Sequence, residues 1–164
     1  MTTSSATRSI EIEAPVEDVF AFIADPHRRM QAQERVFGRH IVVRDVETSP
    51  EGTITGCKVS TRFPPLPIDI TLKVARLEHV PNERMVDRAL NLTKDLDEFT
   101  VEPTQTGTRL TWHAECSSPI PYLEKLGALL SARKSYEGQL DDNLAEIKRE
   151  LENSPDSHPS QPPG

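Results

Sequence analysis

The longest regular pattern of hydrophobic and polar positions covers residues 122–152, a stretch that contains no proline. Its apolar side chains recur every three or four residues, which places them along one side of a helix. A helix of about thirty residues would be roughly 45 Å long, whereas a domain of this size has a radius of gyration of only about 15 Å. We therefore expect a single long C-terminal helix that crosses the whole domain with one face packed on the rest of the chain.

Residues 36–116 have the pattern of β-strands. Segments rich in β-branched residues are separated by turn residues, and in residues 68–74 and 110–116 every second side chain is apolar. Such a pattern predicts about seven antiparallel strands joined by short hairpins, each with one buried face. The expected strands are residues 8–13, 36–47, 53–63, 68–79, 84–92, 96–102 and 108–116.

Two short helices are expected between the first strand and the others. Pro15 suits the first turn of a helix, and Val16, Val19, Phe20 and Ile23 form an apolar stripe behind it. The Asp-Pro pair at residues 25–26 ends this helix and caps a second one that runs to about residue 33. The order of elements predicts an α+β fold in which a curved antiparallel sheet wraps around the C-terminal helix.

The chain is expected to form one domain, because its 164 residues suffice for a single core. We predict a flexible N-terminus at residues 1–7 and a single folded domain at residues 8–152. Residues 153–164 contain four prolines and no periodicity, which predicts a disordered tail.

Charge and composition argue against several classes of function. The net charge is −7 and no basic run is present, so nucleic acid is not expected as a partner. The first residues lack the segments of a signal peptide, and no apolar run is long enough to span a bilayer. We expect a cytoplasmic protein without stable membrane insertion, and the sequence identifies no protein partner.

No catalytic or metal-binding motif is present in the sequence. There is no Gly-rich phosphate loop, no His-Glu-x-x-His and no Gly-x-Ser-x-Gly, and the five histidines lack metal-ligand spacing. Cys57 and Cys116 lie far apart in the chain and are expected to be reduced, buried thiols. We therefore expect neither a metal nor another cofactor.

Any chemistry must come from side chains that point into the space between the sheet and the long helix. The short helices hold these two layers apart at one end, so a cavity is expected there. A mostly apolar cavity with few polar groups is typical of a site for a small molecule. By strand alternation and helix spacing, the candidate ligand-binding residues are Arg88, Tyr136, Trp112, Phe99, Val86, Leu90, Val59 and Phe63.

Arg88 is the candidate with the clearest chemistry, since its neighbours of the same parity, Val86 and Leu90, are apolar. A buried guanidinium without a partner is costly, so Arg88 would anchor an anionic ligand group, pair with a structural carboxylate or lie at the sheet edge. Tyr136 would either donate a hydrogen bond to a ligand carbonyl or fill the core. His40 lies in a segment with apolar residues at both parities, so the pattern does not decide which face of residues 36–47 is buried.

Two segments of the sequence resemble those of a known superfamily. The run SIEIEAPVEDVFAFIADP at residues 9–26 is similar to the opening of the polyketide cyclase/START-type superfamily, and SYEGQLDDNLAEIKRELE at residues 135–152 is similar to its closing helix. The resemblance covers about residues 8–152 and implies the helix-grip fold shared with pollen-allergen-like proteins. Members of the superfamily bind lipids, sterols, polyketides and other apolar molecules; some cyclise or dehydrate polyketides, and others carry ligands or assist partners.

Three hypotheses for the function follow. The first is the binding or carriage of a hydrophobic, lipid- or polyketide-like small molecule in the internal cavity. The second is a polyketide cyclase or dehydratase that uses the same cavity, which requires an acid–base group with a shifted pKa inside it. The third is a protein-interaction module in which the cavity is incidental. Fold alone does not decide between them.

Overall fold

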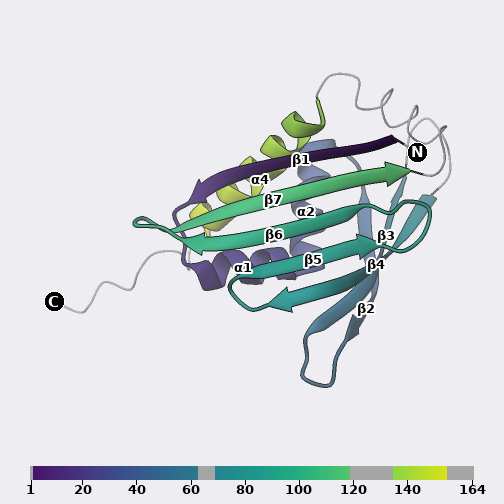
Figure 1. Ribbon diagram of the computed structural model, residues 1–164, viewed down its shortest axis with the longest axis horizontal. Helices are drawn as coiled ribbons and strands as arrows, with labels where there is room; N and C mark the ends of the chain where they lie inside the picture. The colour runs from purple at the N-terminus through teal and green to yellow at the C-terminus, as the bar shows by residue number, and fades with distance from the viewer. Residues whose placement is uncertain (1, 63–68, 119–134, 155–164) are drawn as a thin grey trace.

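The computed structural model describes residues 2–62, 69–118 and 135–154. Seven antiparallel strands form one open sheet in the order β1-β7-β6-β5-β4-β3-β2 (Figure 1). This confirms the predicted α+β class and the number of strands. The strands are β1 (Thr2–Ile12), β2 (Ile41–Thr48), β3 (Ile54–Arg62), β4 (Asp69–Val80), β5 (Arg84–Ala89), β6 (Leu96–Pro103) and β7 (Thr108–Ser118).

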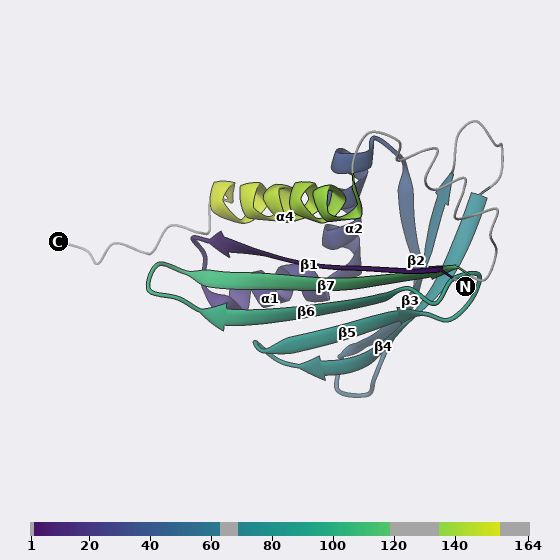
Figure 2. The same ribbon diagram turned by 45° about the horizontal axis from the view of Figure 1, so that its top comes forward.

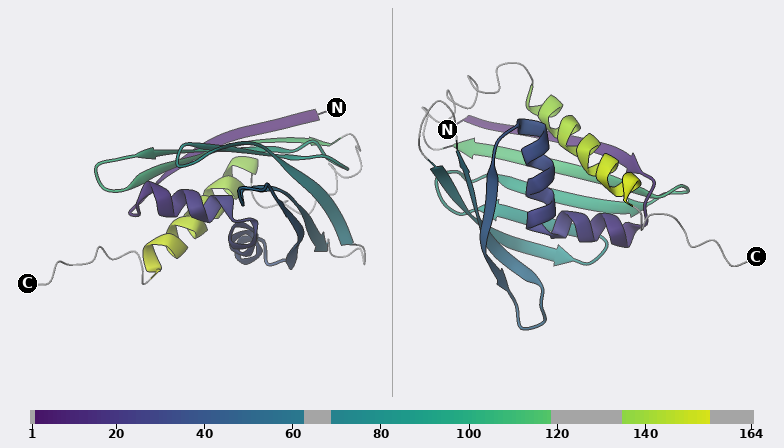
Figure 3. Two further views of the ribbon diagram at one scale, coloured as in Figure 1. Left: turned by 90° about the horizontal axis from the view of Figure 1, so that it is seen from below. Right: turned by 180° about the vertical axis from the view of Figure 1, so that it is seen from behind.

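The described helices, α1 (Val16–Ala24), α2 (Pro26–Phe37) and α4 (Tyr136–Asn153), all lie on one face of the curved sheet (Figure 3). α1 begins after Pro15, whose backbone is extended. The carboxylate of Asp25 accepts hydrogen bonds from the first N–H groups of α2, which is the usual role of an N-cap. Gly38 then ends α2, because its φ of 62° is a left-handed conformation that glycine adopts without steric cost.

Two predicted boundaries in the N-terminal half were wrong. α2 continues to Phe37, so residues 36–37 are helical and the second strand begins only at Ile41. The first strand begins at Thr2, so the prediction of a flexible segment at residues 1–7 does not hold from Thr2 onward. Residues 2–7 are small and show no alternation of apolar and polar side chains. They nevertheless pair with β7, beginning with Thr2 opposite Ser118, and Ala6 is buried.

The C-terminal helix is shorter than the sequence pattern predicted. α4 has 18 residues and begins at Tyr136, and residues 122–134 of the predicted helix lie outside the described residues. Ser135 has an extended backbone, and its hydroxyl oxygen accepts a hydrogen bond from the N–H of Gly138 at 3.1 Å. A helix cannot continue through such an N-cap, so a single helix over residues 122–152 is wrong. α4 is therefore a rod of only about 27 Å, which runs along β1 (Figure 2).

The hydrophobic core lies between the helices and one half of the sheet. Met85 in β5 pairs with Phe99 in β6, and Phe99 pairs with Trp112 in β7, so three large side chains form one inward row. Within the described residues, this core cluster contains no side chain from β2, β3 or β4. Its largest fully buried members are Phe22, Phe99, Ile12, Ile23, Met85, Leu110, Leu144, Ile147 and Val19.

None of the helices in the described part of the chain is both long enough and apolar enough to cross a membrane.

Candidate functional site

The inward face of β5 carries Met85, Asp87 and Ala89, all of which are buried. The register across the sheet extends this face, because Met85 pairs with Phe99 and Asp87 pairs with Asp97. The prediction that the other parity of this strand faces inward is therefore wrong.

Val86, Arg88 and Leu90 consequently do not line the interior. Arg88 is exposed on the outer face, and Leu90, which follows the strand, is 60% exposed. Val86 is buried, but it belongs to the outer row opposite Glu98. Each parity of β5 contains both apolar and charged residues, so alternation alone does not identify the buried one. Arg88 is therefore not an interior ligand anchor.

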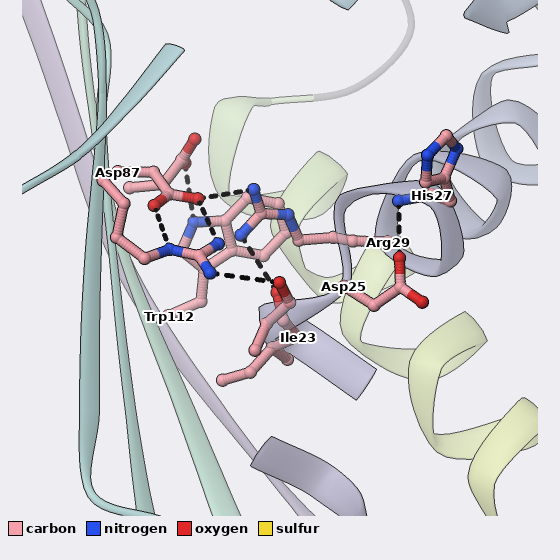
Figure 4. Close-up of polar contacts among 9 residues, drawn as sticks. Ile23, Asp25, His27, Arg29, Asp87 and Trp112 are labelled. Atoms are coloured by element: carbon pink, nitrogen blue, oxygen red, sulfur yellow. Dashed lines mark hydrogen bonds and ion pairs between the residues drawn. The ribbon is translucent and has the colours of Figure 1, made fainter. Parts of the chain in front are cut away.

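Two buried arginines converge on Asp87 from different parts of the chain (Figure 4). Arg29 of α2 donates from Nη2 to Oδ2 of Asp87 at 2.7 Å. Arg76 of β4 donates from Nε to Oδ1 at 2.9 Å and from Nη2 to Oδ2 at 3.2 Å. Burial alone would raise the pKa of Asp87, but the two guanidinium groups outweigh it and hold that pKa below its ordinary value. Asp87 is therefore ionised at neutral pH.

The same two arginines donate hydrogen bonds to backbone carbonyl groups at the C-terminal end of α1. Arg29 Nη1 donates to the carbonyl oxygen of Ile23 at 3.3 Å, and Arg76 Nη1 donates to that of Ala24 at 3.1 Å. The last carbonyl groups of a helix lack partners within the helix and carry partial negative charge, which favours cations there. The arginine–aspartate cluster thus joins the corner between α1 and α2 to strands β4 and β5.

Asp97 is the second carboxyl group of the inward row, between Asp87 in β5 and Ala114 in β7. Its Oδ1 accepts a hydrogen bond from Nε1 of Trp112 at 2.8 Å. Burial raises the pKa of Asp97 to about 6, although the positive charge of Arg29 acts in the opposite direction. A carboxyl group with a pKa close to neutrality can take up and release a proton under physiological conditions. Asp97 is therefore the candidate acid–base group of the interior.

Tyr136 lies in the first turn of α4, where it is half-buried and packs against the core. Burial raises the pKa of Tyr136, and the negative charge of Asp97 adds to this effect. Its hydroxyl group consequently keeps its proton and remains a hydrogen-bond donor at neutral pH. The rings of Phe99 and Trp112 lie beside each other, with centroids 4.9 Å apart. The structure thus brings three of the predicted residues, Tyr136, Trp112 and Phe99, into one interior region.

The residues predicted from the sequence did not include the charged members of this region, Asp97, Asp87, Arg29 and Arg76. Asp97 lies two residues before Phe99, which was correctly placed inward, so the same alternation would have placed Asp97 inward as well. Arg29 lies three residues before the buried Ala32 on α2, which puts both side chains on one side of that helix. A buried charge is rare unless it is paired, and the sequence does not show the pairing.

Strands β2, β3 and β4 carry an apolar inward face beside the polar cluster. Val43 pairs with Val59, and Val59 pairs with Leu72, so these side chains form one row. Ile41 and Ile70 belong to the next row of the same face. All five are half-exposed. Val59 has the same parity as the buried Cys57, and Leu72 has the same parity as Arg76, which reaches the inward Asp87. The register therefore places this row on the helix side of the sheet.

Cys57 connects this apolar face with the arginine–aspartate cluster. It is 8% exposed and lies two residues before Val59 on β3. Its partner on β4 is Val74, two residues before Arg76 of the cluster. Burial raises the pKa of Cys57. The interior therefore has an apolar part along β2–β4 and a polar part around Asp87 and Asp97.

The remaining sequence candidates lie elsewhere. His40 is exposed, with Nδ1 at 2.8 Å from Oε1 of Glu34. Phe63 lies outside the described residues. Cys57 and Cys116 form no disulfide bond; Cys57 is buried as predicted, whereas Cys116 is half-buried. Among residues 2–62, 69–118 and 135–154, no group of histidine, cysteine and acidic side chains has an arrangement that could hold a metal ion.

The chain belongs to the family described as polyketide cyclase/dehydrase and lipid transport, whose model matches residues 3–152. A comparison with curated protein sequences gives no match. The family match agrees with the resemblance of residues 9–26 and 135–152 to the same superfamily.

Solved structures with low sequence identity share the fold. Protein DR_A0006 from Deinococcus radiodurans is 16% identical, with a TM-score of 0.62 and coverage of 91% of this chain and 97% of that one. The two-domain aromatase/cyclase BexL of the BE-7585A biosynthetic pathway is 20% identical, with a TM-score of 0.61; the match covers 93% of this chain and 51% of BexL. A norcoclaurine synthase from Thalictrum is 13% identical, with a TM-score of 0.58 and coverage of 92% and 94%. At such identities the likeness establishes the helix-grip-like fold alone.

Proposed function

We propose that the protein binds a hydrophobic, lipid- or polyketide-like small molecule between its helices and the inward face of β2–β4. The observation that carries this proposal is the row formed by Val43, Val59 and Leu72, which stays half-exposed although it faces the helix side of the sheet. Apolar side chains of a folded domain are normally packed against a core, and an exposed apolar face commonly marks a binding site. The family description, which includes lipid transport, agrees with it.

Two adjacent valines in β2 allow a matched test of the proposal. Val43 faces inward opposite Val59, whereas Val42 faces outward opposite Ser60, and both are half-exposed. Glutamate at either position is the same chemical change in the same strand and differs only in the face of the sheet that receives it. We expect Val43→Glu to weaken binding of the fluorescent apolar anion anilinonaphthalene sulfonate at least tenfold, and Val42→Glu to leave it within about twofold of the wild type, because only Val43 would contact the ligand. Equal affinities of the two variants would refute the proposed site.

A second candidate function, a cyclase or dehydratase reaction at the same site, is favoured by Asp97. An intramolecular aldol cyclisation with loss of water needs a group that removes a proton from a carbon beside a carbonyl and a group that protonates the departing hydroxyl. A carboxyl group with a pKa of about 6 suits both transfers, and Tyr136 can donate a hydrogen bond to the carbonyl oxygen.

The two functions differ in what Asp97→Asn changes. The amide keeps a hydrogen-bond acceptor for Trp112 but cannot transfer protons at neutral pH. If the protein is a cyclase, the variant binds a linear poly-β-ketone and no longer converts it. If the protein is a carrier, neither the wild type nor the variant converts the compound.

A further inference from the structure

The outer face of the sheet carries a row of positive charges. The register places Arg44 of β2 opposite Lys58 of β3, and Lys58 opposite Lys73 of β4. Leu90 continues the row, because its N–H donates to the carbonyl oxygen of Lys73 at 2.8 Å. Like charges directly opposite each other destabilise a sheet. In a chain with a net charge of −7, such a row is therefore a cost to stability that an anionic partner would offset.

Most basic side chains in and beside this row form no ion pair with the residues that the structure describes. Asp45 accepts a hydrogen bond from Nζ of Lys58 at 2.6 Å. Within the described residues, Lys73, Arg88 and Lys94 form no ion pair, and all three are exposed. Elsewhere on the described surface, by contrast, Arg62 and Arg109 are paired with acids.

Two exposed leucines belong to the connection between β5 and β6, which lies at one end of the sheet (Figure 1). Leu90 is 60% exposed and Leu92 is 43% exposed. Leu92 has a φ of 57°, a conformation that is unfavourable for a residue with a Cβ atom. Strained backbone conformations cluster at functional sites.

Hydrogen bonds hold this connection in place without burying its leucines. The side-chain amide of Asn91 donates to the carbonyl oxygen of Thr71 at 3.0 Å, and its oxygen accepts from the N–H of Lys73 at 2.6 Å. At the other side, the N–H of Lys94 donates to the carbonyl oxygen of Ser117 at 2.9 Å. The loop is thus tied to β4 and to β7, and its two leucines stay in solvent.

We propose that this basic surface, defined as Arg44, Lys58, Lys73, Arg88 and Lys94 together with Leu90 and Leu92, docks on a membrane that contains anionic lipids. The choice of partner rests on complementarity: lipid headgroups supply negative charge for the cations, and the acyl region beneath them accepts exposed leucines. The contact is peripheral, because the basic surface, as far as the structure describes it, offers two leucines to the bilayer. It is independent of the interior site, since these side chains lie on the opposite face of the sheet or in the loop.

Flotation of the full chain with lipid vesicles tests the docking proposal. We expect the protein to float with vesicles of phosphatidylcholine and phosphatidylglycerol at low salt, and to remain unbound with phosphatidylcholine alone. Each basic residue near an anionic surface contributes roughly a fivefold change in affinity, so Lys73→Gln combined with Arg88→Gln should weaken binding at least tenfold. The charge-matched control, Arg109→Gln combined with Arg149→Gln, changes two exposed arginines elsewhere and should bind like the wild type.

Variants of the two leucines distinguish between a membrane and an acidic protein as the partner. Leu90→Glu combined with Leu92→Glu should reduce flotation at least tenfold, whereas Leu77→Glu, at a leucine that is 54% exposed elsewhere on β4, should reduce it only slightly. Absence of wild-type binding to the anionic vesicles would overturn the proposal. Equal losses of vesicle binding in the test variants and in their matched controls would also overturn it. If the leucine variants still float while soluble polyglutamate displaces the wild type, the surface recognises an acidic polymer and the membrane proposal fails.

Discussion

Replacement of Asp97 by asparagine should make the protein more stable at neutral pH. The pKa of Asp97 in the folded protein is about 6, compared with an ordinary value of 3.8. Because the folded-state pKa is raised, the stabilisation by the protonated carboxyl is fully present below about pH 3.8 and is lost as the pH rises through about 6. A difference of about 2 pKa units corresponds to about 3 kcal/mol of unfolding free energy at pH 7, which is an upper bound.

Asparagine imitates the protonated carboxyl and still accepts the hydrogen bond from Trp112. The difference in unfolding free energy between Asp97→Asn and the wild type should therefore be close to zero near pH 4. It should grow to at most about 3 kcal/mol in favour of the variant at pH 7. Urea denaturation of both proteins at these two pH values measures it. A difference that does not change with pH, or a variant that is less stable at pH 7, would refute the reasoning.

The remaining predictions concern stability, measured by urea denaturation. Asp87→Asn removes the counter-charge of the buried arginines and should lower the unfolding free energy by about 3–5 kcal/mol. The control Asp69→Asn, in an exposed pair with Arg62, should lower it by less than about 1 kcal/mol. Equal losses of stability in the two variants would contradict the buried cluster. The pKa of Asp87 is lowered, so its contribution should be lost as the pH falls below about 4. Gly107→Ala should cost about 1–3 kcal/mol, because its Cβ would lie 2.1 Å from the carbonyl oxygen of Ile12; an unchanged stability would contradict this packing.

The sequence predicted the sheet well wherever one parity was clearly apolar. Phe99 and Val101 in β6, and Leu110, Trp112 and Ala114 in β7, are buried as their alternation indicates. In β5 the alternation gave the wrong face, because Asp87 is buried and Arg88 is exposed. The buried charge is tolerated only because Arg29 and Arg76 reach it from distant parts of the chain, and such long-range pairing leaves no local pattern.

Periodicity also overestimated the C-terminal helix. The spacing of apolar residues continues across Ser135, but the hydroxyl of that serine competes for the N–H of Gly138 and starts a helix there. Serine is a common N-cap residue, so Ser135 was a signal for a helix start. The regular apolar spacing on both sides of it favoured one continuous helix instead. In the candidate site, the aromatic residues could be predicted from local spacing, whereas the ion pairs join distant parts of the chain and could not.

The most direct test of ligand binding inside the sheet is a methyl NMR titration of the wild-type protein with anilinonaphthalene sulfonate. Selective labelling of isoleucine, leucine and valine methyl groups reports on both faces of the sheet. If the ligand binds inside the sheet, the largest shift changes occur at Val43, Val59 and Leu72, and the resonances of Val42 stay in place. Shift changes confined to the outer face, or spread evenly over the protein, would contradict binding inside the sheet.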